Sequence, residues 1–253
     1  MILDRFRLDG KVAIVTGASA GLGVAFAEGL AAAGADVAIG ARRADRLDET
    51  KARVETLGRR CVAVATDVTD PEGCTRLVAA AVDELGRVDI LVNSAGTASA
   101  MPATREQPAD FRAVVDVNLF GSYWMAQACG RVMPAGSSIV NIGSVAGSSS
   151  TGLPQAAYSA SKAALIGLTR DLAQQWSGRK GIRVNLLVPG IFPTDLSAQF
   201  PDEFLERMKA DRIPMGRLGE VDELVAALLF LASDASTYVT GIQLPVDGGM
   251  LTG

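Results

Sequence analysis

The stretch 150–162 carries a tyrosine and a lysine whose types and spacing suit acid–base chemistry. Tyr158 and Lys162 are four residues apart, and the apolar spacing that follows them predicts a helix over about 155–176. Side chains at positions i and i+4 lie on one helix face. A neighbouring ammonium favours the phenolate and lowers the pKa of a phenol, which is otherwise about 10. Such a pair could move a proton to or from an alcohol, although the same spacing also occurs on ordinary solvated helix faces.

A glycine-rich turn near the start of the chain is typical of a phosphate-binding loop. Residues 16–23 read Thr-Gly-Ala-Ser-Ala-Gly-Leu-Gly, directly after an apolar run at 11–16 and at the start of a helix-like stretch at 21–33. Glycines let the backbone approach a pyrophosphate, and the helix N-terminus offers free N–H groups. The spacing is G-x-x-x-G-x-G, so we expect dinucleotide binding, with a structural turn as the alternative.

The end of the second expected strand indicates which dinucleotide would bind. Strand 36–40 is followed by Ala41, Arg42 and Arg43, and the carboxylate that usually holds a ribose 2′-hydroxyl is missing there. Asp36 stands at the other end of the strand. An arginine would instead pair with a 2′-phosphate. This favours NADP(H), while NAD(H) is possible if both arginines are merely solvated.

Strand-like and helix-like stretches alternate through the whole chain, which predicts an α/β fold. Strands are expected over 11–16, 36–40, 61–65, 88–93, 138–142, 182–188 and 241–246, and helices over 21–33, 44–57, 71–85, 108–132, 155–176, 203–210 and 221–232. This alternation predicts a Rossmann-like, doubly wound parallel sheet of about seven strands with helices on both faces. We find no linker or repeat and expect one domain over 1–253. Ligands bind such sheets at the carboxyl ends of the strands.

Several polar residues follow those expected strand ends. Asp67 and Val68 come after the third strand, the Asn93–Gly96 stretch after the fourth and Ser144 after the fifth. Taken singly, the first two are also compatible with a loop turn or a helix cap. Asn118 falls within a helix-like stretch, where it could be no more than an exposed polar residue.

The segment 190–216 is the least regular part of the chain. It contains prolines 193, 201 and 214 together with glycines 190 and 216, and a short helical patch. A long irregular segment after a strand's carboxyl end is often a lid over a binding site. A merely structural excursion is the alternative.

Composition excludes several classes of protein. A net charge of −4 with no basic tract argues against a nucleic-acid partner, and no apolar run is long enough to span a membrane or to form a signal peptide. The three cysteines have neither disulfide nor zinc spacing and suit a reducing cytoplasm. There is no histidine, so Ser-His and Cys-His catalysis and histidine metal sites are excluded, and we expect no metal.

Together these motifs resemble the short-chain dehydrogenase/reductase family over essentially the whole chain. The motifs that carry the resemblance are Thr16-Gly17-x-x-x-Gly21-x-Gly23, Asn93-x-Ala95-Gly96, Asn118, Ser144, Tyr158-x-x-x-Lys162, Pro189-Gly190, Thr240-Gly241 and Val246-Asp247-Gly248-Gly249. Ser94 departs from the pattern, since many members have a second asparagine there. The pattern is similar to 3-oxoacyl-carrier-protein reductases and also to sugar or polyol dehydrogenases.

The resemblance implies a role for each of the four polar residues near the expected site. Tyr158 would be the general acid in reduction and the base in oxidation. Lys162 would lower the pKa of Tyr158 and hold the nicotinamide ribose. Ser144 would hydrogen-bond the substrate oxygen, and Asn118 would hold a water linking Lys162 to solvent.

The resemblance also implies a set of cofactor contacts. Gly17, Ser19, Leu22 and Gly23, with Gly21, would form the pyrophosphate turn. Asp67 and Val68 would flank the adenine, and Asn93, with Ala95 and Gly96 after it, would lie beside the adenosine ribose. Pro189, Gly190, Ile191 and Thr194 would contact the nicotinamide end. Family members of this length usually form homotetramers, so a homotetramer or homodimer is expected.

We therefore expect an NADP(H)-dependent carbonyl reductase or secondary-alcohol dehydrogenase that acts on a small molecule. An NAD-dependent sugar or polyol dehydrogenase is the main alternative, and a non-catalytic dinucleotide sensor or scaffold is a remote one. The loops expected to select the substrate are 95–104, 145–155 and 191–214, which are rich in small and apolar residues. They favour a compact, weakly polar ketone.

Overall fold

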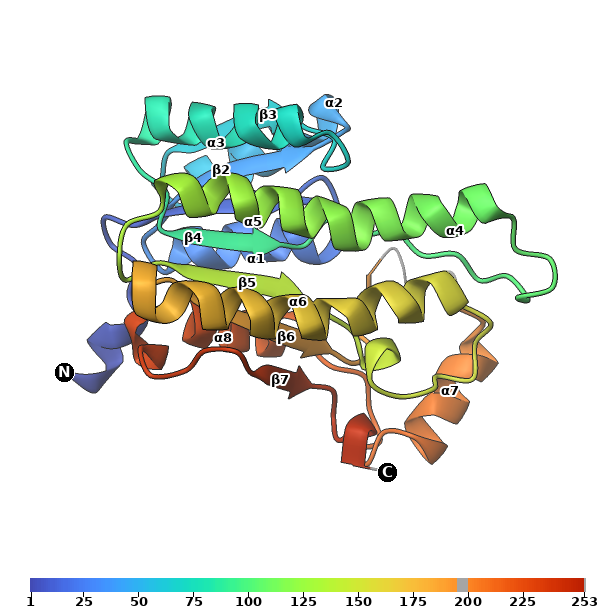
Figure 1. The fold of residues 1–253 in the computed structure, drawn as a ribbon. Helices are drawn as coiled ribbons and strands as arrows, with labels where there is room; N and C mark the ends of the chain where they lie inside the picture. The colour runs from blue at the N-terminus through green and yellow to red at the C-terminus, as the bar shows by residue number, and fades with distance from the viewer. Residues whose placement is uncertain (195–199, 253) are drawn as a thin grey trace.

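A seven-stranded parallel sheet forms the centre of the computed structural model (Figure 1), which describes residues 1–194 and 200–252. The strand order is β3-β2-β1-β4-β5-β6-β7. The strands are β1 Val12–Thr16, β2 Asp36–Ala41, β3 Cys61–Ala65, β4 Ile90–Asn93, β5 Ser138–Ile142, β6 Arg183–Pro189 and β7 Gln243–Val246. Every neighbouring pair is parallel. The predicted sheet is confirmed, and the strand ends lie within two residues of the expected ones.

Helices cover both faces of the sheet. They are α1 Gly21–Ala32, α2 Ala44–Thr56, α3 Pro71–Leu85, α4 Pro108–Val115, α5 Gly121–Val132, α6 Ala156–Lys180, α7 Asp202–Asp211 and α8 Val221–Ala232. Short 3₁₀ turns lie at Ile2–Phe6 (η1), Val145–Gly147 (η3), Asp234–Ser236 (η5) and Met250–Thr252 (η6). No helix among the described residues combines the length and the apolar character needed to cross a membrane.

Alternating side chains of the strands supply two separate cores. In β1, Ala13 and Val15 pack with α1, α2 and α8, whereas Val12 and Ile14 pack with α3, α5 and α6. This division follows from the two-residue period of a strand. Figure 1 shows α3, α5 and α6 in front of the sheet and α1 and α8 behind it. The strands are thus buried on both faces, as parallel strands usually are.

The long helix expected over 108–132 is interrupted. A π-helical turn, η2 at Asp116–Phe120, separates α4 from α5. The apolar spacing suggested one helix because a π-turn inserts a single residue without breaking the helical rod. The turn buries Asn118, which is 0% exposed.

The sheet order reverses between β1 and β4, and this arrangement fixes where a ligand can bind. The chain moves outward from β1 to β2 and β3, then returns to β4 on the other side of β1. A crevice opens at such a switch point, outside the carboxyl ends of the strands. Helix α7 lies beyond those ends in Figure 1. The expected lid at 190–216 includes α7, while residues 195–199 lie outside the described residues.

Candidate active site

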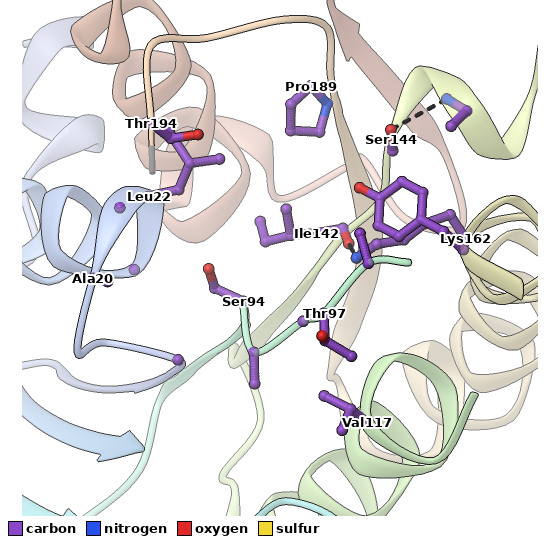
Figure 2. Close-up of a pocket in the computed structure, with 18 of the residues that line it drawn as sticks. Ala20, Leu22, Ser94, Thr97, Val117, Ile142, Ser144, Lys162, Pro189 and Thr194 are labelled. Carbon is purple, nitrogen blue, oxygen red and sulfur yellow. Dashed lines mark hydrogen bonds between the residues drawn. The ribbon is translucent and has the colours of Figure 1, made fainter. Parts of the chain in front are cut away.

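A cavity of about 790 Å³ lies at the carboxyl ends of the strands and brings together most of the predicted site residues. Figure 2 shows Leu22 and Thr194 at one side of it, across from Ser144 and Lys162. The predicted residues that line it are Gly17, Ser19, Gly21, Leu22, Gly23, Arg42, Arg43, Asp67, Val68, Ala95, Gly96, Ser144, Tyr158, Lys162, Pro189, Gly190, Ile191 and Thr194. Asn93 and Asn118 are the two predicted residues that do not line it.

The glycine-rich turn is packed too closely for side chains. Gly17 has a φ of +72°, and a Cβ placed there would lie 2.7 Å from Ala95 Cα. A Cβ on Gly23 would lie 2.3 Å from the Gly17 carbonyl oxygen. Helix α1 begins at Gly21, and its N-cap residue Ala20 has no side-chain oxygen to accept from the N–H groups of the first turn. These groups face a cavity, and the arrangement fits a pyrophosphate.

Two arginines lie next to this turn, where the adenosine half of a dinucleotide is expected. Arg42 and Arg43 both line the cavity after β2, and Arg43 Nη2 donates a hydrogen bond to Ser19 Oγ at 3.1 Å. Asp36, at the start of β2, is paired with Arg59 at 2.7 Å and Arg60 at 2.8 Å. Its carboxylate therefore stabilises the fold and is not a cofactor ligand, which agrees with its place at the amino end of the strand. The residues present fit a phosphorylated ribose, because two guanidinium groups and a hydroxyl meet there.

The side chain of Asn93 stabilises the wall behind the cavity. Its Nδ2 donates to the Ser122 carbonyl at 3.0 Å and to Asn141 Oδ1 at 2.9 Å, and only 3% of the residue is exposed. The side chain is thus not available to the adenosine ribose, and the expectation that Asn93 lies beside this ribose stays a prediction for its backbone. Asn93 instead ties β4 to β5 and α5 through buried hydrogen bonds, which the position of an asparagine at a strand end does not reveal.

Asn118 is a buried connector rather than an exposed polar residue. Its Oδ1 accepts from the Thr97 amide at 2.8 Å, and its Nδ2 donates to the Thr97 carbonyl and to Ser161 Oγ, both at 2.9 Å. The side chain therefore joins the π-turn to the loop after β4 and to α6. The expected water between Asn118 and Lys162 stays a prediction.

Lys162 is held against the sheet beneath Tyr158. Its Nζ donates to the Ile142 carbonyl at 2.8 Å and lies 5.7 Å from the centre of the Tyr158 ring. Figure 2 shows Lys162 directed toward Ile142 at the cavity floor. Burial disfavours the ammonium and lowers the pKa of Lys162 to about 8. The buried lysine therefore holds its proton less tightly than a solvated lysine does.

The pKa of Tyr158 differs from the sequence-based expectation. Burial raises it, while a hydrogen bond with the Ser144 side chain acts in the lowering direction without outweighing burial. Burial outweighs any lowering by the Lys162 ammonium, which lies 5.7 Å from the ring centre, so the net direction is opposite to the one expected. Ser144 Oγ also accepts from the Ala146 amide at 3.1 Å (Figure 2), which fixes its position at the start of η3.

Further lining residues come from the loops expected to select the substrate. They are Thr97, Ser99, Val145, Thr151, Leu153, Gln155, Phe192, Phe200, Phe204 and Met208. The apolar composition of these loops indicated apolar lining residues such as Leu153, Phe192 and Phe200, but nothing in the sequence pointed to the polar ones, Thr97, Thr151 and Gln155. Loop side chains have no fixed period, so only their position after a strand end could have pointed to them.

Comparison with known proteins shows the family and supports the fold. Residues 17–251 match a family model described as Enoyl-(Acyl carrier protein) reductase. The chain is 44% identical to a galactitol 2-dehydrogenase (L-tagatose-forming) from Cereibacter sphaeroides, over 96% of each protein. It is 36% identical to the crystal structure of a gluconate 5-dehydrogenase from Burkholderia cenocepacia J2315 in complex with NADP and tartrate, with full coverage of both chains and a TM-score of 0.92.

A similar fold is also found in a dehydrogenase of a different substrate class. A 7α-hydroxysteroid dehydrogenase, complexed with NADH and 7-oxo glycochenodeoxycholic acid, is 35% identical with a TM-score of 0.91. That match covers 98% of this chain and 96% of the other. The family match and these relatives cover nearly the whole chain, so the chain belongs to the short-chain dehydrogenase/reductase family of NAD(P)-dependent oxidoreductases.

Proposed function

We propose that this protein is an NADP(H)-dependent oxidoreductase that interconverts a secondary alcohol of a sugar or polyol and the corresponding ketone. The observation that carries the proposal is the placement of two groups of residues in one cavity. Tyr158, Ser144 and Lys162 line it together with the arginines that follow β2. A reacting alcohol and a long phosphorylated cofactor could therefore occupy it together. The names of the galactitol and gluconate relatives support the sugar or polyol class.

Tyr158 and Ser144 transfer the proton of the substrate oxygen and hydrogen-bond that oxygen. In oxidation, the Tyr158 phenolate takes the hydroxyl proton as the carbon gives up a hydride. In reduction, the Tyr158 hydroxyl returns a proton to the oxygen. Ser144 donates a hydrogen bond to that oxygen while charge develops on it. A bound nicotinamide supplies the acceptor or donor of the hydride.

Lys162 assists Tyr158 through its positive charge. A positive charge at Nζ favours the phenolate electrostatically, and it also provides a donor for a ribose hydroxyl. The Ile142 carbonyl holds Nζ in place through the 2.8 Å hydrogen bond. Asn118 lies next to this group through Ser161 and Thr97, where it would keep Lys162 in contact with a water.

Arg42, Arg43 and Ser19 support the choice of NADP(H). A 2′-phosphate would meet two guanidinium groups, one of which already contacts the Ser19 hydroxyl. An NAD-dependent polyol dehydrogenase is the second candidate, since the steroid dehydrogenase relative was solved with NADH. A protein that binds dinucleotide without turnover is the remote alternative.

The cofactor experiment is a pair of titrations with NADPH and NADH, on the natural protein and on Arg42→Ala and Arg43→Ala. We expect NADPH to bind about tenfold or more tightly than NADH, a margin of about 1.4 kcal/mol, and either substitution to reduce this margin. Arg46→Ala is the matched control, because Arg46 is exposed and pairs with Glu49 away from the cavity. Equal binding of the two dinucleotides would instead favour the NAD-dependent alternative.

Turnover is tested with Tyr158→Phe. We expect turnover with a polyol to fall by about a hundredfold or more, because the proton-transfer group is lost, while NADPH binding persists. Near-normal turnover would contradict the mechanism. A natural protein that binds NADPH tightly but oxidises no alcohol and reduces no ketone would support the non-catalytic alternative.

We also propose that the protein assembles into a homotetramer or homodimer. Apolar side chains are exposed on Phe111 and Phe120, next to α6, and on Tyr238 and Ile242, before β7. Burial of such side chains between copies would be favourable. Light scattering coupled to size-exclusion chromatography distinguishes these assemblies from a monomer.

A further inference from the structure

We infer that the substrate is an uncharged polyhydroxy compound, and that the Gln155 amide, held by Thr151, contacts a hydroxyl next to the reacting carbon. This inference rests on the proposed function and narrows its substrate class. It separates a neutral polyol or ketose from a sugar acid and from an acyl chain on a carrier protein. The argument starts from the charges around the cavity.

Charged side chains are confined to the parts of the cavity assigned to cofactor and proton transfer. Among the described residues that line it, the charged ones are Arg42, Arg43, Asp67 and Lys162. The first three follow β2 and β3, at the adenosine side. Lys162 Nζ donates to the Ile142 carbonyl and belongs to the proton-transfer group with Tyr158. The loops at the substrate side therefore offer no cation to a carboxylate, within the part of the chain that the structure describes.

Two cations near the substrate side stand outside the lining. Arg207 lies with its guanidinium carbon 5.6 Å from the centre of the Phe204 ring and does not line the cavity. The other is Arg212, after α7. It is half-buried, and its Nη2 donates to the Ser150 carbonyl at 3.1 Å and contacts Ser149 Oγ at 3.5 Å. It therefore holds the loop from behind rather than facing the cavity. A carboxylate placed at the substrate side would be desolvated without a partner, which is costly.

Neutral hydrogen-bonding groups are present where the charges are missing. Gln155 Nε2 donates to Thr151 Oγ1 at 2.8 Å, and both residues line the cavity. Gln155 stands three residues before Tyr158, one helical turn away, at the N-cap of α6. The contact with Thr151 fixes the amide plane. Gln155 Oε1 accepts no hydrogen bond from the described residues, so it can accept one from a substrate hydroxyl.

The remaining lining at this side is apolar and limits size. Leu153, Phe204, Met208 and Met250 line the cavity, and the rings of Phe200 and Phe204 pack in a tilted arrangement with centres 5.2 Å apart. An apolar wall can contact the carbon skeleton of a polyol. A site built to bond a hydroxyl rejects compounds that lack it, because its buried polar groups would be left unpaired.

The experiment compares matched substrates with NADP⁺ as oxidant and the intact protein as enzyme. The panel holds polyols of four to six carbons, the sugar acids of the same lengths, and cyclohexanol as an alcohol without neighbouring hydroxyls. We expect kcat/KM for the better polyols to exceed that of the matched acids by about tenfold or more. Sugar acids used as well as polyols would overturn the inference, and a loss of that use in Arg212→Gln would identify the missed cation.

Gln155→Leu and Thr151→Val test the proposed contact. We expect each to lower kcat/KM for polyols by about tenfold while cyclohexanol changes by less than about threefold. Gln155→Glu, which keeps an acceptor oxygen, provides a second variant if Gln155→Leu folds poorly, and we expect it to retain most polyol activity. Gln174→Leu, exposed on the same helix, is the matched control.

Two failures are distinguishable in this design. Equal losses with polyols and cyclohexanol would mean that Gln155 merely supports Tyr158, and the inference would be wrong while the proposed function stands. Absence of turnover with every alcohol in the panel and with the corresponding ketones, in a protein that binds NADPH, would contradict the proposed function itself. NADPH titration of each variant separates these outcomes from misfolding.

Discussion

Asn118 Nδ2 donates to Ser161 Oγ at 2.9 Å, and this buried hydrogen bond joins the π-turn to helix α6. Ser161 in turn donates to the Tyr158 carbonyl at 2.7 Å. Ser161 is only 1% exposed, so water cannot replace either hydrogen-bond partner of its hydroxyl. Through these two hydrogen bonds, Ser161 connects Asn118 to the first turn of α6, the helix that carries Tyr158 and Lys162.

Ser161→Ala is expected to misplace this turn. Losing the hydroxyl leaves the Asn118 amide without one buried partner, which costs about 1–3 kcal/mol of unfolding free energy. We also expect kcat to fall by about tenfold with a changed pH profile, because the geometry around Tyr158 and Lys162 changes. Chemical denaturation and pH–rate profiles measure the two effects. Ser161→Thr, which keeps the hydroxyl, should restore the profile, and an unchanged profile in Ser161→Ala would mean that the residue is only structural.

Ser144→Ala is expected to move the pH dependence of alcohol oxidation. The Ser144 hydrogen bond acts to lower the pKa of Tyr158, whereas burial raises it. Without that bond the pKa rises further, so the phenolate needed for oxidation forms at higher pH. The rising limb of the kcat profile should therefore shift to the alkaline side, with turnover reduced by about a hundredfold through loss of the donor to the substrate oxygen. A shift toward acid would contradict this account.

Lys162→Met is expected to stabilise the fold at neutral pH. Burial lowers the pKa of Lys162 to about 8 from 10.5, so between these values the unfolded chain binds more protons and stability rises with pH. At pH 7 the natural protein buries the charged form, and we expect the variant to be more stable by about 1–3 kcal/mol. The difference should shrink between pH 8 and 10.5. Urea unfolding at pH 7 and pH 10 measures it, and a difference that grows with pH would contradict the prediction.

The three cysteines are expected to be unreactive in the folded protein. Burial raises the pKa values of the Cys61 and Cys74 thiols to about 12, and it raises that of Cys129 as well. Since the thiolate is the reactive form, a disulfide reagent at pH 8 should label none of them until the chain is denatured. Mass spectrometry after timed labelling checks this. Rapid labelling of Cys129 in the native state would indicate local opening of the core between α3 and α5.

The sheet was predictable because each strand is a short apolar run bounded by turn residues. The strand Ser138–Ile142 and the helices Pro71–Leu85 and Val221–Ala232 have the expected bounds. In α3, Asp70 caps the N-terminus, Pro71 opens the helix and Gly86 ends it in a left-handed conformation. Local chemistry of this kind fixes an element's ends without reference to the rest of the fold.

The parts that could not be predicted depend on contacts between distant segments. Nothing local distinguishes Asn118 from an exposed polar residue, because its burial comes from Thr97 and Ser161. The raised pKa of Tyr158 likewise depends on how deeply the cavity buries the ring. The sequence predicted only that the loop 145–155 selects the substrate, and the contact between Gln155 and Thr151 depends on how that loop folds.

Around the π-turn at Asp116–Phe120, the fold depends more on the number of residues than on their types. Each residue of an α-helix advances the rotation by about 100°, so the extra residue turns the packing face of α5 relative to that of α4. This rotation lets α4 pack on α6 while α5 packs on α3. Removal of one residue would swing one of these helices away from its neighbour. Substitutions on the outer surface of this rod should be tolerated, whereas single-residue deletions and insertions should not.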